Sequence, residues 1–190
     1  MTATIITRTL VYDGWYKFWR LRVRMPDGTE VERHLEDHGA AVAVLPYDPA
    51  RRVAMLVSMP RAPVIDAGQP PLLEAIAGNI ASDPEESARR EAMEEGGVQL
   101  GPLAFVAQIW PMPALSTERL TLYLAPYTAE DRVETGGGAE GEHESIIVHE
   151  IALTDLRAMR LTGTLHDAKT LLLVQSLELR APELFTPVLG

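Results

Sequence analysis

The sequence predicts an α+β fold. Short apolar runs bounded by turn residues are typical of strands, and they recur along most of the chain. Helix signals are confined to 84–96 and to two segments near the C-terminus, in which apolar residues have helical spacing. The chain has 190 residues, 46% of them apolar, which suits one ordinary domain with a small extension. We therefore expect strands mixed with a few helices in layers.

The N-terminal part is rich in aromatic residues and predicts a separate β-layer. Residues 17–25 alternate with the period of two of a half-buried strand, 26–28 form a turn signal, and the alternation resumes in 29–36. This pattern is typical of an antiparallel β-hairpin. We expect residues 1–38 to form this layer and residues 39–190 to form the main domain.

The main domain contains the remaining strand and helix signals. Residues 60–71 hold four prolines and a glycine and are expected to form an irregular loop, and 135–144, where glycines and glutamates mix, are expected to form another. Strands are expected at 40–47, 52–59, 72–78, 104–110, 119–127 and 145–152, and helices at 84–96, 153–163 and 166–179.

Composition excludes several classes of function. The 17 basic and 27 acidic residues give a net charge of −10, which argues against a nucleic-acid module with a basic patch. The lack of cysteine excludes disulfides, thiolate zinc sites and a cysteine nucleophile. No apolar run approaches the roughly 18 residues of a membrane span, and the N-terminus lacks a signal peptide's apolar core. We expect a cytoplasmic protein without membrane contact.

One helix, at 84–96, is indicated by its ends as well as by its helix propensity and its length. Asp83 is a good N-cap, Pro84 suits the first helical position, and Glu86 completes the spacing of a capping box. Gly96 and Gly97 supply a stop at the C-terminal end. These signals predict a helix of about three turns.

Three acids of this helix form a candidate metal site. Spacings of three and four residues place Glu91 near both Glu94 and Glu95. Carboxylates crowded in this way repel one another, and a hard divalent cation such as Mg²⁺ relieves the repulsion. The alternative is a solvated helix in which Arg90 forms ordinary ion pairs.

The segment from Arg90 to Val98 resembles the second half of the Nudix box, R-E-hydrophobic-x-E-E-x-G-hydrophobic, and meets all of its fixed positions. One departure is that only eleven residues separate Gly78 from Arg90, two fewer than usual, and no glutamate occupies the first acidic position. The resemblance implies a Nudix-type α/β/α sandwich and a hydrolase of nucleoside diphosphate derivatives.

Further segments are similar to the branch of this family that acts on ADP-ribose and nucleotide sugars, with GDP-mannose pyrophosphatases nearest. This branch commonly forms homodimers in which an N-terminal β-layer reaches the partner's site, so the resemblance implies a homodimer and a dimerisation role for residues 1–38. The similar segments are 73–78, 116–118, 136–144 and 162–170.

The resemblance also implies a metal centre, with Mg²⁺ as its ion and Mn²⁺ as an alternative that carboxylates equally accept. Glu91, Glu95 and the backbone carbonyl of Ala77 are the expected ligands. Glu94 is expected to be a ligand or to lie beside the ligands, and Arg90 is expected to orient the glutamates.

The remaining candidate residues lie in loops and in the hairpin. Glu142 is the candidate general base and Glu144 the candidate ligand of a further metal ion; the alternative is a solvated acidic loop. Arg61 is expected to grip a phosphate, Trp15 to stack on the base, and Glu118 to contact substrate. For Arg61 and Trp15 the alternatives are a surface cation and a packing aromatic.

These observations predict hydrolysis of the pyrophosphate bond of ADP-ribose or a nucleotide sugar to a nucleoside monophosphate and a sugar phosphate. One alternative is a hydrolase of dinucleotides or nucleoside triphosphates. Another is a nucleotide-binding protein of the same fold without catalysis.

Overall fold

The computed structural model describes residues 2–138, 141 and 144–186. The chain divides into two compact units, which are described separately. The first comprises Met1–Ala40 and Ile109–Leu120, and the second comprises Ala41–Gln108 and Thr121–Gly190. The first unit thus contains the expected N-terminal layer together with a later segment that the hairpin pattern did not predict.

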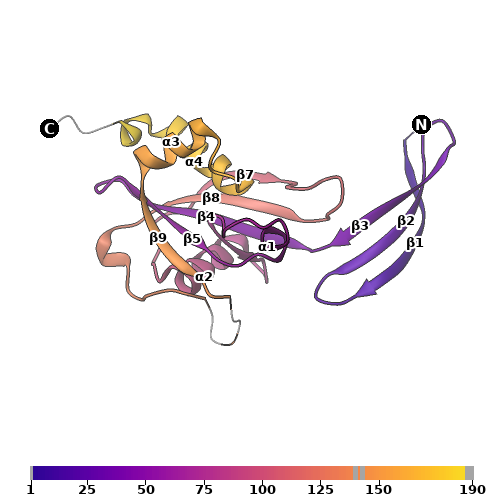
Figure 1. Cartoon of the computed structure of the whole chain (residues 1–190), viewed down its shortest axis with the longest axis horizontal. Coiled ribbons are helices and arrows are strands. Elements are labelled where there is room, and N and C mark those ends of the chain that lie inside the picture. Colours follow the sequence, from indigo (N-terminus) through magenta and orange to yellow (C-terminus); the bar gives the residue numbers. More distant parts are fainter. Residues whose placement is uncertain (1, 139–140, 142–143, 187–190) are drawn as a thin grey trace. The chain divides into compact units, whose positions relative to one another are not determined.

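The first unit is built on an antiparallel sheet with the order β1-β2-β3 (Figure 1). Its strands are β1 (Thr4–Asp13), β2 (Lys17–Arg24) and β3 (Glu30–Asp37). The predicted hairpin is β2–β3, paired in continuous register. β1 was not predicted, because register shifts after Ile5 and Leu10 break the period of two that identifies a strand.

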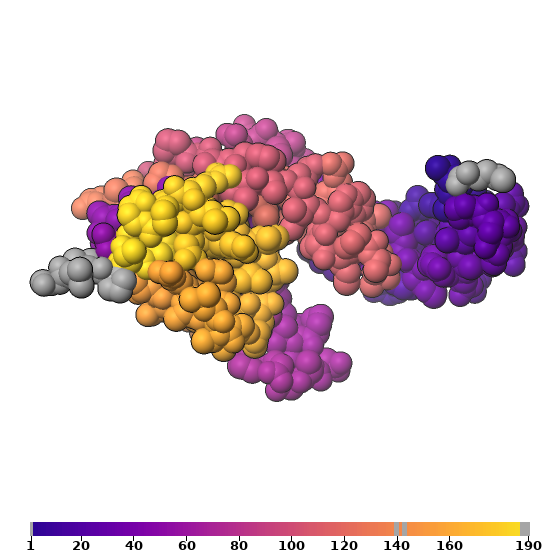
Figure 2. Space-filling model, turned by 90° about the horizontal axis from the view of Figure 1, so that it is seen from above, coloured from indigo at the N-terminus to yellow at the C-terminus, as the bar shows by residue number. Residues whose placement is uncertain are grey.

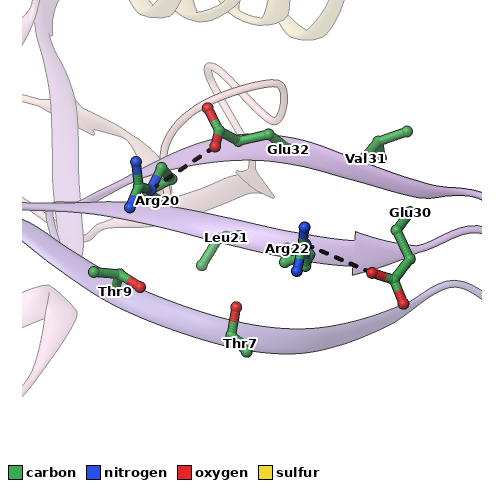
Figure 3. A pocket seen from close by; sticks show the side chains of 8 residues that line it. All are labelled: Thr7, Thr9, Arg20, Leu21, Arg22, Glu30, Val31 and Glu32. Atoms are coloured by element: carbon green, nitrogen blue, oxygen red, sulfur yellow. Dashed lines mark ion pairs between the residues drawn. The ribbon is translucent and has the colours of Figure 1, made fainter.

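One face of this sheet is charged. Arg20 and Arg22 of β2 pair with Glu32 and Glu30 of β3, and the four side chains line a hollow of about 430 Å³ (Figure 3). Leu21, which is buried, also lines this hollow, together with Val31, Thr7 and Thr9. The ion pairs are exposed to solvent and add little stability.

The second unit contains a sheet with the order β7-β8-β4-β5-β9, and β6 pairs with β4. The strand predicted at 72–78 is wrong in extent: β6 covers 76–79, and Glu74 forms only an isolated bridge to Val57. The other strands agree with prediction to within two residues or so at each end. Their bounds are β4 (Ala40–Asp48), β5 (Val53–Ser58), β6 (Ile76–Asn79), β7 (Ala104–Ile109), β8 (Arg119–Pro126) and β9 (Ile147–Ala152).

Helices cover both faces of this sheet. α2 (Pro84–Gly96) packs against β5 and β6, and α3 (Leu153–Thr162) and α4 (Ala168–Arg180) lie on the opposite side (Figure 1). In Figure 2, α3, α4 and the turn after them, in orange and yellow, together cover one face of the unit. Because β4 and β5 are buried on both faces, the expected three-layer sandwich is present.

Three short helices complete the described chain. The expectation of an irregular loop at 60–71 is wrong in one part, because Ala62–Asp66 form a single helical turn, α1. Proline pre-organises the first turn of a helix, and Pro63 occupies such a position. The 3₁₀ helices are η1 (Ala129–Asp131) and η2 (Pro182–Phe185). Among the described residues, no helix combines the length and the apolar character needed to cross a membrane.

Candidate active site

Asp83 and Gly97 cap the two ends of α2, as the sequence predicts. The side chain of Asp83 accepts hydrogen bonds from the backbone N–H groups of Glu85 and Glu86, at 2.9 and 3.0 Å. Gly97 ends the helix in the left-handed conformation, with φ of 64°, and its N–H donates to the last turn. Both ends of α2 are thus fixed, and its buried face, which includes Ala88 and Ala92, also carries Glu91 and Glu95.

Two of the three acids face inward. Glu91 and Glu95 are 8% and 5% exposed, so a fully solvated helix is the wrong description for this pair. The backbone N–H of Ala77, on β6, donates to Oε2 of Glu95 over 3.3 Å. The carboxylate of Glu91 lies against Gly78, where an added Cβ atom would come within 1.8 Å of Oε1. Glycine is therefore needed at position 78 for Glu91 to occupy this place.

The buried acids influence each other's ionisation. Burial and the negative charge of Glu91 raise the pKa of Glu95 to about 8, although the bond from Ala77 opposes this. The charge of Glu144 raises the same pKa further, and that of Arg61 lowers it. The structure therefore brings Glu144, from the glycine-rich loop, within electrostatic range of the acid pair on α2.

Arg90 and Glu94 lie on the solvent side of the helix. Arg90 donates to the carboxylates of both Glu91 and Glu94, and over 3.4 Å to the carbonyl oxygen of Asn79. These are the contacts that an orienting role for Arg90 requires. Glu94 is more exposed than Glu91 and Glu95, and its carboxylate forms an ion pair with Arg90.

The glycine-rich segment makes specific contacts that sequence reasoning missed. The backbone N–H groups of Gly137 and Gly138 donate to the carbonyl oxygens of Glu95 and Glu94, each over 2.9 Å. These are carbonyls at the C-terminal end of α2, which have no partner inside the helix. Glu142, the candidate base, lies outside the described residues.

Arg61 is within electrostatic range of Glu95 and is hydrogen-bonded to another acid. Its Nε and Nη2 atoms donate to the two carboxylate oxygens of Glu74. The charges of Glu95 and Glu144 also act on it. Sequence reasoning did not select Glu74, although a single acid within the apolar run 72–78 was a signal of a buried charge.

Trp15 and Glu118 belong to the first unit. Trp15 is 84% exposed and lines a hollow of about 420 Å³. The backbone N–H of Glu118 donates to the side chain of Ser116. The other residues that line the hollow are Tyr12, Tyr16, Phe18 and Glu36.

The donor chemistry of the acid pair suits a hard divalent cation. Glu91 and Glu95 offer carboxylate oxygens, which Mg²⁺ and Mn²⁺ accept, and their crowding disfavours full ionisation without a cation. Within the part of the chain that the structure describes, no group of three or more acidic or histidine side chains forms a ready-made metal cluster.

Comparison with known proteins identifies the family. No family model matches the chain. The GDP-mannose pyrophosphatase of Yersinia enterocolitica is 32% identical over 177 residues, which cover 90% of this chain and 92% of the relative. The chain belongs to the Nudix family. The GDP-mannose pyrophosphatase of Cronobacter sakazakii is 34% identical to this chain and covers 80% of it. The GDP-mannose pyrophosphatase of Escherichia coli K12 is 29% identical to this chain and covers 92% of it.

A solved structure supports the fold of this Nudix protein. A crystal structure titled ADP compounds hydrolase matches it with a TM-score of 0.77 at 14% sequence identity, over 96% of each chain. The predicted α+β fold and the predicted family are confirmed. The shortened loop before Arg90 has therefore not changed the architecture on which α2 is held.

Proposed function

We propose that this Nudix hydrolase cleaves the pyrophosphate bond of GDP-mannose or a related nucleotide sugar, or of ADP-ribose, with Mg²⁺ as its metal ion. The products would be a nucleoside monophosphate and a sugar phosphate. The observation that carries the proposal is the buried pair Glu91 and Glu95, one helical turn apart beside Ala77, in a relative of GDP-mannose pyrophosphatases.

Each residue of the centre has a proposed task. Glu91, Glu95 and the carbonyl oxygen of Ala77 would hold the ion, and Glu144 would serve a further ion. When bound, a divalent ion neutralises the charge of a diphosphate and lowers the pKa of water. Arg90 holds the carboxylates of Glu91 and Glu94 in place, which supports its assignment as an orienting residue.

The proposal also assigns the general base and the residues that contact the substrate. Glu142 would remove the proton from the attacking water. Arg61 would contact a phosphate oxygen through Nη1, since Nε and Nη2 bind Glu74. Trp15 would stack on the base, a role its exposed ring allows, and Glu118 would contact substrate.

We also propose that the protein is a homodimer joined through the first unit. Supporting this, β1 presents exposed apolar side chains along an edge of its sheet. Exposed apolar edges of this kind are normally covered by a partner. A cytoplasmic location and the lack of a nucleic-acid partner stay predictions from composition.

Product analysis tests the reaction. The wild-type protein is incubated with GDP-mannose, ADP-ribose, a dinucleotide and a nucleoside triphosphate, each with Mg²⁺, with Mn²⁺ and with a chelator. We expect monophosphate and sugar phosphate from the first two substrates and none with the chelator. Turnover of triphosphates or dinucleotides alone would replace the proposed substrate, and no turnover would favour a binding protein.

Variants of the acid pair test the metal site. We expect Glu91→Gln and Glu95→Gln to lower kcat/KM by about 100-fold or more, because each removes a charge that the site needs. Both should also abolish the rise in Tm that Mg²⁺ produces in the wild type. Glu85→Gln is the matched control, since Glu85 is exposed on the same helix. Equal effects of the three substitutions would contradict the proposed site.

A further inference from the structure

Glu74 is a buried carboxylate that two cations bind. It is 4% exposed, Arg61 donates to both of its oxygens over 3.0 and 3.1 Å, and Lys169 Nζ donates to Oε2 over 2.7 Å. Burial opposes the ionisation of Glu74, but Arg61 and Lys169 outweigh it and hold its pKa below the ordinary value. Glu74 is thus an ionised group on which both cations depend.

The same contacts join α4 to the strand that carries Ala77. Asp167 caps α4 by accepting from the N–H of Thr170, and it also binds Lys169 over 3.1 Å. The hydroxyl of Thr170 in turn accepts from the backbone N–H of Ala75 over 2.6 Å. The first turn of α4 is therefore anchored to the chain two residues before Ala77, whose N–H binds Glu95.

Arg61 connects this network to the acid pair. Its bidentate bond to Glu74 fixes the plane of the guanidinium group. Its charge acts on Glu95, and the charges of Glu95 and Glu144 act on it in return. The position of the Arg61 guanidinium depends on Glu74, and the position of Glu74 depends in part on Lys169.

We propose that Lys169 and Glu74 are positioning residues that hold Arg61 in the orientation in which it binds a substrate phosphate. Lys169 does not itself contact the substrate; it binds Glu74, and Glu74 binds Arg61. Its positive charge also offsets part of the charge of Glu74, so that Arg61 is not fully neutralised by that partner. This inference rests on the proposed function.

Kinetics of Lys169 variants test the inference. A contact that contributes the same binding energy in the ground state and in the transition state affects KM alone. Lys169→Met should therefore raise KM for GDP-mannose about tenfold and change kcat little. Lys169→Arg, which keeps the charge, should restore most of the affinity. Because Lys169 acts through Arg61, KM of the double variant Arg61→Met/Lys169→Met should equal that of Arg61→Met alone.

Arg160→Met is the matched control. Glu178 on α4 is shared by Arg157 and Arg160, as Glu74 is shared by Arg61 and Lys169, so this variant also removes one of two cations from a largely buried carboxylate. It should lower Tm without changing KM. If Lys169→Met behaves in the same way, Lys169 has a structural role only and the inference is overturned.

The outcomes separate the inference from the proposed function. If the wild type turns over GDP-mannose and the rise in KM of the double variant is the product of the rises in the two single variants, Arg61 and Lys169 act independently. That result contradicts the inference and leaves the proposed function intact. If the wild type shows no turnover, the proposed function fails, and calorimetric titration of the same variants with GDP-mannose tests the coupling through Kd. If GDP-mannose also does not bind, both fail.

Discussion

At the scale of single residues, the burial of Glu91 and Glu95 depends on the small size of Gly78 and on a backbone hydrogen bond from Ala77. Glu91 can lie beside β6 because residue 78 has no side chain, and Glu95 is held there by a backbone N–H rather than by a cation. The two carboxylates are therefore buried close together without full neutralisation, which raises the pKa of Glu95. A buried acid with a raised pKa of this kind is a candidate functional residue, and here it supports the metal site that we propose.

Gly78→Ala should separate function from stability. The atoms nearest to the added methyl group belong to the end of the flexible Glu91 side chain, which can move away at small cost in the free energy of unfolding. Displacing that carboxylate should lower kcat/KM by about 100-fold. Activity assays together with urea unfolding check this, and unchanged activity would show that Glu91 needs no fixed position.

At the scale of elements, the glycine-rich segment at 136–138 packs against the C-terminal end of α2. Gly136 has φ of 68°, and an added Cβ atom would lie 2.3 Å from the carbonyl oxygen of Glu95. A Cβ atom added to Gly97, at the end of α2, would lie 2.2 Å from the carbonyl oxygen of Glu134. Neither position tolerates a side chain, because the obstacle is backbone on both sides.

Gly136→Ala should therefore destabilise the protein by about 2 kcal/mol or more, through strain and loss of the contact with α2. Gly163→Ala is the control, since Gly163 also has a positive φ, of 73°, but has no atom within 4 Å of an added Cβ. We expect about 1 kcal/mol there. Urea unfolding measures both, and equal losses would show that the docking contact adds nothing.

Arg51 joins three elements of the second unit. It follows β4 and binds Asp48 over 2.6 Å and Glu150 of β9 over 2.7 and 3.0 Å. Tyr127, after β8, donates to the same carboxylate of Glu150. Arg51 lowers the pKa of Glu150, and although burial opposes the ionisation of Asp48, backbone N–H groups and Arg51 lower its pKa as well.

This cluster predicts the acid dependence of stability. A depressed folded-state pKa stabilises the protein above the unfolded-state pKa, here near 4.5 for Glu and 3.8 for Asp, and the contribution is lost as pH falls through the folded-state pKa. Arg51→Met should thus lower the free energy of unfolding most at neutral pH and least in acid. Denaturation across this pH range checks it, with Arg52→Met as a control whose effect should not vary with pH.

At the scale of the whole molecule, the two units differ in how they are stabilised. The sheet of the second unit is covered by helices on both faces. In the first unit every residue of β1 is exposed, including apolar residues such as Ile5 and Val11. A small sheet with an uncovered apolar edge strand is marginal by itself, which is the physical reason for the proposed homodimer.

Val11→Glu should weaken that dimer. Val11 is 58% exposed on β1, and a charge buried between two copies would be costly. We expect sedimentation analysis to show the mass of a dimer for the wild type and of a monomer for the variant. Val133→Glu, at a 51% exposed valine of the second unit, is the control and should remain dimeric. A monomeric wild type would contradict the proposal directly.

The sequence by itself determined the parts of the protein that depend on local chemistry. The N-cap and C-cap of α2, the β2–β3 hairpin and the apolar strands other than the one at 72–78 were predicted, because caps, turns and periodicity act over a few residues. The spacing of Glu91 and Glu95 likewise follows from the helix alone. These features, with the Nudix-like motif, were sufficient to identify the family.

Only the tertiary structure decided which groups meet around those acids. Lys169 is 95 residues from Glu74, and nothing local indicates that these two residues and Arg61 share one buried ionic contact. The same holds for the docking of Gly136 on α2 and for β1, whose bulges hide its period. Long-range packing brings such residues together, and no pattern along the chain records it.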